Sequence, residues 1–119
     1  MLGNYVLSKG YYEEYYLKAL KTKALIEKEY QELFEKYDVI CAPVVQSKAP
    51  MVGESLNNPL KMYKGDIYTT AVNIAGVPAI SLPIGCDSEG LSIGVQFISN
   101  HFEEGKMIQI AHRVEQEKK

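Results

Sequence analysis

Residues 73–85 read NIAGVPAISLPIG, an apolar stretch that contains two glycines and two prolines and is still strand-like in its middle. Proline has no N–H to donate to a sheet, so a strand between Pro78 and Pro83 is predicted to be short, about four residues. Gly76 suits a helix C-terminus, because glycine adopts the left-handed backbone conformation there without steric cost. The stretch therefore predicts a helix end, a tight turn, a short buried strand over residues 79–82 and a kink at Pro83.

Residues 11–37 carry the strongest helical pattern in the chain. They contain no glycine or proline and are rich in Glu, Lys, Leu and Ala, which are good helix formers. Their apolar residues recur at spacings of mostly three, four and seven, which predicts one buried stripe along a long helix. The stripe consists of Tyr12, Tyr16, Ala19, Leu20, Ile26, Tyr30, Leu33, Phe34 and Tyr37.

The remaining elements predict the fold class. Short strands are expected over residues 39–42, 79–82 and 93–98, with a turn over 87–90 and a proline-rich loop over 44–59. Further helices are expected over residues 2–7, 60–75 and 103–117, and the last is predicted to face inward with Met107, Ile108, Ala111 and Val114. Helices between short strands predict an α/β fold, with a mixed β-sheet covered by helices. Three strands with two apolar faces make a thin sheet, so the chain is expected to be a fragment of a larger fold.

Composition and charge exclude several classes of function. The net charge of −2 and a pI near 5.7 give no electrostatic basis for nucleic-acid binding by this segment. The apolar runs are too short to cross a membrane, and residues 1–10 lack the pattern of a signal peptide. Cys41 and Cys86 lie in apolar surroundings and are expected to be buried, reduced thiols. We therefore expect a cytoplasmic location.

The chain by itself does not describe an active site. The sequence contains no phosphate-binding glycine loop or metal-ligand spacing. Its one match to G-x-S-x-G, GLSIG at residues 90–94, follows the expected 87–90 turn and leads into an expected strand, not into a helix as that motif requires. His101 and His112 lack a partner at a useful spacing and are expected to be surface or capping residues. We expect no catalytic residue and no cofactor in this chain.

Asp66 is the one unusual polar residue. It follows Gly65 in MYKGDIYTTAVNIAG, where the residues on its C-terminal side are mostly apolar. A carboxylate in such surroundings needs a cation or several N–H donors. Asp66 either caps a helix and complements its dipole, or it receives a substrate ammonium group. The residues alone leave both interpretations open.

Four segments together resemble a known family. They are MLGNYVLSKGYYEEYYLKA (1–19), YDVICAPVV (37–45), PLKMYKGDIYTTAVNIAGVPAISLPIG (59–85) and GLSIGVQFISNHFEEGKMIQIAHRVEQ (90–116). In this order they resemble the C-terminal part of amidase-signature enzymes. The segment G-x-P-A-I-S-x-P is shared by many amidases, whereas MY-x-x-D-I-x-T is more specific to the A subunits of the glutamyl-tRNA(Gln)/aspartyl-tRNA(Asn) amidotransferases.

The resemblance implies a function for the parent enzyme. Residues 1–119 would be a single C-terminal segment of an amidase-signature domain, without the family's two serines and lysine that hydrolyse glutamine. In the family, the aspartate that matches Asp66 contacts the α-amino group of glutamine, and roles in shaping the ligand pocket are conceivable for Tyr63, Thr69 and Gln96. The ammonia produced would pass to B and C subunits, which use ATP and Mg²⁺ to amidate Glu-tRNA(Gln) or Asp-tRNA(Asn).

Two alternatives stay open at this point. The chain could come from another amidase-signature hydrolase, against which MY-x-x-D-I-x-T argues, or it could be a binding or scaffold module without catalysis. In either case the isolated chain is expected to be inactive, and its apolar strand edges are expected to make it self-associate or leave it only marginally stable.

Overall fold

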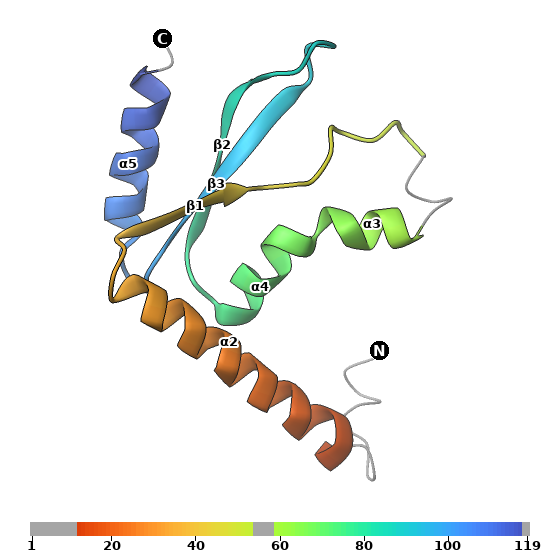
Figure 1. The fold of residues 1–119 in the computed structure, drawn as a ribbon, viewed down its shortest axis with the longest axis vertical. Coiled ribbons are helices and arrows are strands. Elements are labelled where there is room, and N and C mark those ends of the chain that lie inside the picture. Colours follow the sequence, from red (N-terminus) through yellow and green to blue (C-terminus); the bar gives the residue numbers. More distant parts are fainter. Residues whose placement is uncertain (1–11, 54–58, 118–119) are drawn as a thin grey trace.

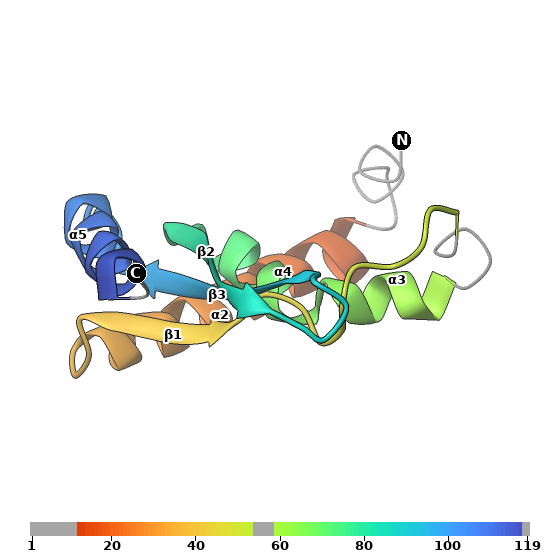
Figure 2. The same ribbon diagram turned by 90° about the horizontal axis from the view of Figure 1, so that it is seen from above.

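In a computed structural model, the chain forms a three-stranded sheet with helices on both faces (Figures 1 and 2). The structure describes residues 12–53 and 59–117. Their elements are η1 (Tyr12–Leu17, a π-helix), α2 (Lys18–Phe34), β1 (Val39–Pro43), α3 (Pro59–Gly65), α4 (Ile67–Ala75), β2 (Ala79–Cys86), β3 (Ser92–Ser99) and α5 (Glu104–Glu117). This order confirms the predicted α/β class with a long helix near the N-terminus. The helix predicted over residues 2–7 lies outside the described residues.

The sheet has the strand order β1-β3-β2, and both neighbouring pairs are antiparallel. We expected a mixed sheet because helices between strands often connect parallel neighbours. β1 and β2 do run in the same direction, and α3 and α4 connect them. However, β3 lies between these two strands and runs the opposite way (Figure 1). Every pairing among the described strands is therefore antiparallel.

Each face of the sheet carries its own hydrophobic cluster, because side chains alternate along a strand. On one face, Ile98 of β3 packs with Val72 and Ala75 of α4, and helix α2 adds partly buried side chains. On the other face, Phe97 packs with Met107 of α5 and with other residues of α5 and β2. The central strand β3 is thus covered on both sides over residues 96–99.

The stretch at residues 73–85 folds largely as predicted. Gly76 has φ 68° and ends α4, and its N–H lies 3.0 Å from the carbonyl oxygen of Val72. The predicted strand end at Pro83 is wrong, because β2 continues to Cys86. A bulge between Pro83 and Gly85 shifts the register, and β2 is an edge strand among the described residues, where proline is tolerated.

The predicted stripe of the long helix is only partly buried. Ile26, Tyr30 and Phe34 pack against the first cluster, and burial raises the pKa of Tyr30. No residue of α2 is fully buried, and Leu20 and Leu33 are exposed, so the prediction of one buried stripe along the helix is wrong for much of its length. The helix leaves the sheet along most of its length (Figure 1), which explains why only its C-terminal half finds apolar partners.

The last helix and the hairpin before it agree closely with the sequence pattern. Met107 and Ala111 are buried, and Val114 packs beside them, but Ile108 is exposed where we expected it to face inward. The 87–90 turn is confirmed, since Asp87 Oδ1 accepts hydrogen bonds from the N–H groups of Glu89 and Leu91, both at 2.9 Å.

Lys106 ties α5 to the start of β1. Its Nζ lies 3.0 Å from Asp38 Oδ1 and 3.2 Å from Glu103 Oε2. The hydrogen bond to Asp38, followed by the one to Glu103, raises the pKa of Lys106. The pair joins residues 68 positions apart at the surface.

The expected burial of the two cysteines is wrong. Cys41 and Cys86 are both free and exposed. Cys41 is the register partner of Phe97 and so shares its face of the sheet, but α5 lies mainly over β2 and β3. The thiol of Cys41 therefore stays uncovered, although its sequence neighbours are apolar.

The chain exposes more surface than its mass predicts. Its accessible surface is 9353 Å², whereas a compact monomer of 13.4 kDa exposes about 6,500 Å². Its radius of gyration is 17.6 Å, against about 13.5 Å for a compact domain of this length. The molecule is a thin slab with extents of 57 × 41 × 18 Å (Figure 2). By these measures the chain is less compact than a self-contained domain of the same length.

Among the described helices, none combines the length and apolarity needed to cross a membrane.

Candidate functional site

Asp66 lies at the junction of α3 and α4, where the single helix expected over residues 60–75 is broken. Its backbone, with φ −94° and ψ 1°, departs from helical geometry and serves as the N-cap of α4. The prediction of one helix is wrong because Gly65 and the β-branched Thr69 and Thr70 weaken the helical preference here. The break presents the Asp66 side chain at the start of a new helix.

The carboxylate of Asp66 does not cap this helix. The main-chain carbonyl of Asp66 accepts hydrogen bonds from the N–H of Thr70 at 2.9 Å and from its hydroxyl at 2.8 Å. The hydroxyl of Thr69 also approaches this carbonyl at 3.3 Å. The side chain of Asp66 makes no capping hydrogen bond. Its main chain therefore performs the local structural role, and its carboxylate takes no part in capping the helix.

Asp66 is exposed, as are its neighbours Tyr63 and Ile67. We expected apolar surroundings that would draw the carboxylate away from water, and in this chain those surroundings are absent among the described residues. Tyr63 is 71% exposed and does not enclose a ligand by itself. The site is thus open to solvent. A negative charge at a helix N-terminus is stabilised by the helix dipole, so this position favours a carboxylate even without a capping bond.

Gln96 has a role that the sequence analysis missed. It is only 3% exposed, and its Nε2 donates hydrogen bonds to the carbonyl oxygens of Pro43 and Tyr68, each at 2.9 Å. These bonds connect β1, β3 and the first turn of α4. The signal available in the sequence was a single amide within the apolar strand SIGVQFIS, because a buried amide requires hydrogen-bond partners.

The sheet beside this turn has small side chains. Ala42, Gln96 and Ser81 form one row across the three strands. Gly94 lies on the same face of β3, and a Cβ there would lie 3.5 Å from Val44 Cγ2 and 3.6 Å from Ser81 Oγ. Ala42, Ser81 and Gly94 therefore add little side-chain volume to this face, next to the helix turn that Gln96 holds, and Ser81 is exposed there.

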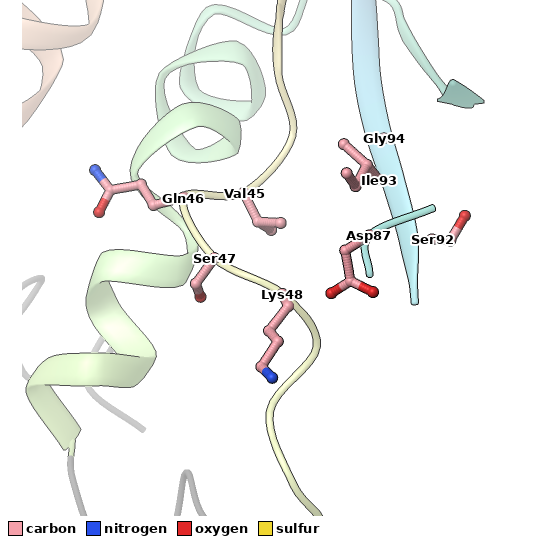
Figure 3. A pocket seen from close by; sticks show the side chains of 8 residues that line it. All are labelled: Val45, Gln46, Ser47, Lys48, Asp87, Ser92, Ile93 and Gly94. Atoms are coloured by element: carbon pink, nitrogen blue, oxygen red, sulfur yellow. The ribbon is translucent and has the colours of Figure 1, made fainter. Parts of the chain in front are cut away.

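A separate hollow of about 340 Å³ lies between the loop after β1 and the β2–β3 hairpin (Figure 3). Its lining residues are Val45, Gln46, Ser47, Lys48, Asp87, Ser92, Ile93 and Gly94. Lys48 is ion-paired with Glu89, and Asp87 is engaged by the turn. Asp66 is not part of this lining, so we do not assign the ligand site to the hollow.

The other predicted polar residues do not assemble around Asp66. His101 is exposed in the loop before α5, and His112 is exposed on α5. In residues 12–53 and 59–117, no group of three or more His, Cys, Asp or Glu side chains could hold a metal ion. The site described by this chain therefore consists of one carboxylate, a helix turn and the strand residues that support it.

Residues 1–108 match the model of the Amidase family. The chain therefore belongs to the amidase family, as the four sequence segments indicated. This places the three strands and their helices within a larger known fold.

Within the family, this chain is more similar to the A subunits of glutamyl-tRNA(Gln) amidotransferases than to an allophanate hydrolase. Over 116 residues the chain is 54% identical to the A subunit of the glutamyl-tRNA(Gln) amidotransferase of Lachnospira eligens, with 98% of this chain and 24% of that protein covered. The crystal structure of the corresponding protein from Thermotoga maritima superimposes with a TM-score of 0.78 and 41% identity, covering 93% of this chain and 24% of that one. A Kluyveromyces lactis allophanate hydrolase gives a TM-score of 0.72 and 25% identity over 82% of this chain and 16% of that one. The chain thus spans about a quarter of the length of the curated relatives it matches.

Proposed function

We propose that this chain is the part of a tRNA-dependent amidotransferase, within its A subunit, that recognises the α-ammonium group of glutamine. The single observation that carries this proposal is the exposed carboxylate of Asp66 at the start of α4, which makes no capping hydrogen bond. The higher identity to amidotransferase subunits than to allophanate hydrolase supports it over a general amidase function.

The recognition chemistry follows from charge. A carboxylate and an ammonium form charge-assisted hydrogen bonds, which are shorter and about twice as strong as neutral ones. Simple amides lack the ammonium, so Asp66 would select a free amino acid over them. The family resemblance adds an arginine for the α-carboxylate of glutamine, supplied from outside the matching segment.

The bond-breaking step would use groups from other parts of the parent protein. A serine hydroxyl attacks the side-chain amide carbon of glutamine, the amide nitrogen leaves as ammonia, and water then releases glutamate from the acyl-enzyme. The B and C subunits would deliver this ammonia to glutamyl- or aspartyl-tRNA, activated with ATP and Mg²⁺. We place the assembled complex in the cytoplasm as part of the same proposal.

The test is an Asp66→Asn substitution in a working enzyme. Residues 1–119 would replace the corresponding segment of a full-length relative, and the chimera would be assembled with its partner subunits. Loss of a charged hydrogen bond should lower kcat/KM for glutamine by roughly 30- to 1000-fold, equivalent to about 2–4 kcal/mol. Ammonia supplied directly bypasses this contact, so the ammonia-dependent reaction should be nearly unchanged.

The matched control is Asp38→Asn, which removes a surface carboxylate that pairs with Lys106 away from the site. This variant should keep both activities, because exposed ion pairs contribute little. Equal losses with glutamine and ammonia in Asp66→Asn would indicate a structural role for Asp66 and would refute the proposal.

A further inference from the structure

The Gln96 amide is held in one orientation. Its Nε2 has two hydrogens, and each has a main-chain carbonyl at 2.9 Å, one on Pro43 and one on Tyr68. Because both partners can only accept, the nitrogen must face them and the Oε1 must point elsewhere. A side chain that is 3% exposed and uses both donor hydrogens acts as a specific link between elements.

This link fixes the end of α4 that carries Asp66. Tyr68 is two residues beyond Asp66, about 3 Å along the helix axis. The opposite end of α4 is attached by Val72 and Ala75, which are buried in the first cluster. Apolar contacts are not directional, and the link from Gly76 into β2 restrains only the C-terminal end of the helix. The hydrogen bond to Tyr68 adds a directional restraint at the end that carries Asp66.

We infer that Gln96 is a positioning residue for Asp66: by bonding Pro43 and Tyr68 together, it sets where the Asp66 carboxylate stands relative to the sheet. The inference rests on the proposed role of Asp66 in binding glutamine. Since the Asp66 side chain makes no capping bond of its own, its position follows the helix turn to which it belongs. Gln96 would then control the affinity for glutamine without touching it.

The first experiment uses the chimeric full-length enzyme with its partner subunits. Gln96→Met keeps the length of the side chain and removes both donors, and Gln96→Glu keeps the shape but can only accept. Both should raise the KM for glutamine on the order of tenfold, because a misplacement of about 1 Å can cost up to 100-fold. kcat and the ammonia-dependent reaction should change less than twofold.

The control for this experiment is Gln109→Met, which removes an exposed glutamine on α5. It should leave the KM unchanged. An unchanged KM in both Gln96 variants would overturn the inference. So would a parallel loss of the glutamine- and ammonia-dependent reactions, because that pattern reports a general loss of structure.

A double-mutant cycle tests whether Gln96 acts through Asp66. In the Asp66→Asn background, Gln96→Met should add less than a twofold increase in KM. A full tenfold increase in that background would show that Gln96 acts independently of Asp66, and would overturn the inference.

Hydrogen exchange separates this inference from the proposed function. The N–H groups of Thr69 and Thr70 bond to the Asp66 carbonyl at 3.1 and 2.9 Å, so they report on the first turn of α4. Gln96→Met should increase their exchange rates, while amides of α5 stay unchanged. Unchanged exchange at Thr69 and Thr70 would overturn the link between Gln96 and the first turn of α4.

If Asp66→Asn alone left glutamine kinetics intact, the proposed function would fail, and the role assigned to Gln96 in glutamine affinity would fail with it.

Discussion

Two regions of the molecule differ in how well their apolar side chains are covered. In the covered half, made of β2, β3 and α5, Phe97 is 6% exposed and Met107 is 5% exposed. In the uncovered half, made of α2 and α3, Leu25 is 64% exposed and Leu60 is 74% exposed. The covered half has a closely packed core around Phe97 and Met107, whereas the uncovered half presents surface that other parts of a larger fold would bury.

The difference bears on the site because Asp66 lies directly after α3, in the uncovered half. Its support comes from the covered half, through Gln96 of β3. The molecule thus combines a firmly held backbone turn with an open surface around the carboxylate. Under the function proposed above, such a combination would suit one wall of a pocket whose other walls come from elsewhere in the parent protein.

The largest effect we expect is in activity. The isolated chain should release no ammonia from glutamine or from simple amides, because the sequence offers no nucleophile and base arrangement. The same chain grafted into a full-length relative should restore turnover. Ammonia release by the isolated chain above a buffer blank, persisting after its serines are changed to alanine, would contradict both this prediction and the view of the uncovered half as an incomplete site.

The next largest effect is on stability in the covered half. Phe97→Ala should lower the free energy of unfolding by about 3–5 kcal/mol, because it leaves a cavity between β3 and α5. The measurement is urea unfolding of the isolated chain followed by circular dichroism. Phe102→Ala is the matched control. This phenylalanine is 95% exposed, so its loss should change the free energy of unfolding by less than about 0.5 kcal/mol. Similar losses in the two variants would break the comparison between the halves.

A smaller effect concerns the uncovered half. Leu25→Lys should change the free energy of unfolding of the isolated chain by less than about 0.5 kcal/mol. It should destabilise the full-length chimera by roughly 2–3 kcal/mol, because there the side chain would be covered.

We also expect the unmodified chain to self-associate at high micromolar concentration and Leu25→Lys to weaken that association, as measured by sedimentation velocity. A sharply melting monomer at that concentration would argue against an uncovered half.

The smallest effect concerns the helix end that precedes β2. Gly76→Ala should lower the free energy of unfolding by about 1 kcal/mol, because φ is 68° at this position. A Cβ there would meet nothing within 4 Å, so the penalty comes from the backbone conformation alone. Gly65→Ala is the control, as Gly65 ends α3 with an ordinary φ and an equally open Cβ position. It should be neutral or slightly stabilising in the same unfolding assay. A similar cost at both positions would contradict the left-handed cap.

The features that the sequence predicted well depend on local chemistry. Gly76 ends a helix, Asp87 organises a turn and the Met107–Ala111 spacing marks the buried side of α5, all through residues close in the chain. Burial could not be predicted in the same way. Leu33 fits the apolar periodicity of the long helix, and Cys41 has apolar sequence neighbours, but both are exposed. Whether such a side chain is covered depends on which element lies over it, and α5 lies mainly over β2 and β3.

The site could be predicted only in part for a similar reason. Asp66 was recognisable as a charge among apolar residues, although its exposure and the helix break were not expected. The link made by Gln96 joins positions 53 residues apart in one bond and 28 apart in the other. No local pattern contains those partners, so the amide could be recognised as unusual but its carbonyl acceptors could not be named.

The position of β3 between β1 and β2 also has a consequence for the time course of folding. β1 ends at Pro43, but the strand that pairs with it is the last of the described strands to be made, at residues 92–99. At translation rates of about 5–20 residues per second, β1 waits several seconds for its first neighbour. During that interval the central strand is missing from the sheet, and Ile98, which completes the cluster between α2 and α4, has not been made. We therefore expect the nascent chain to be a substrate for chaperones until residue 99 has left the ribosome.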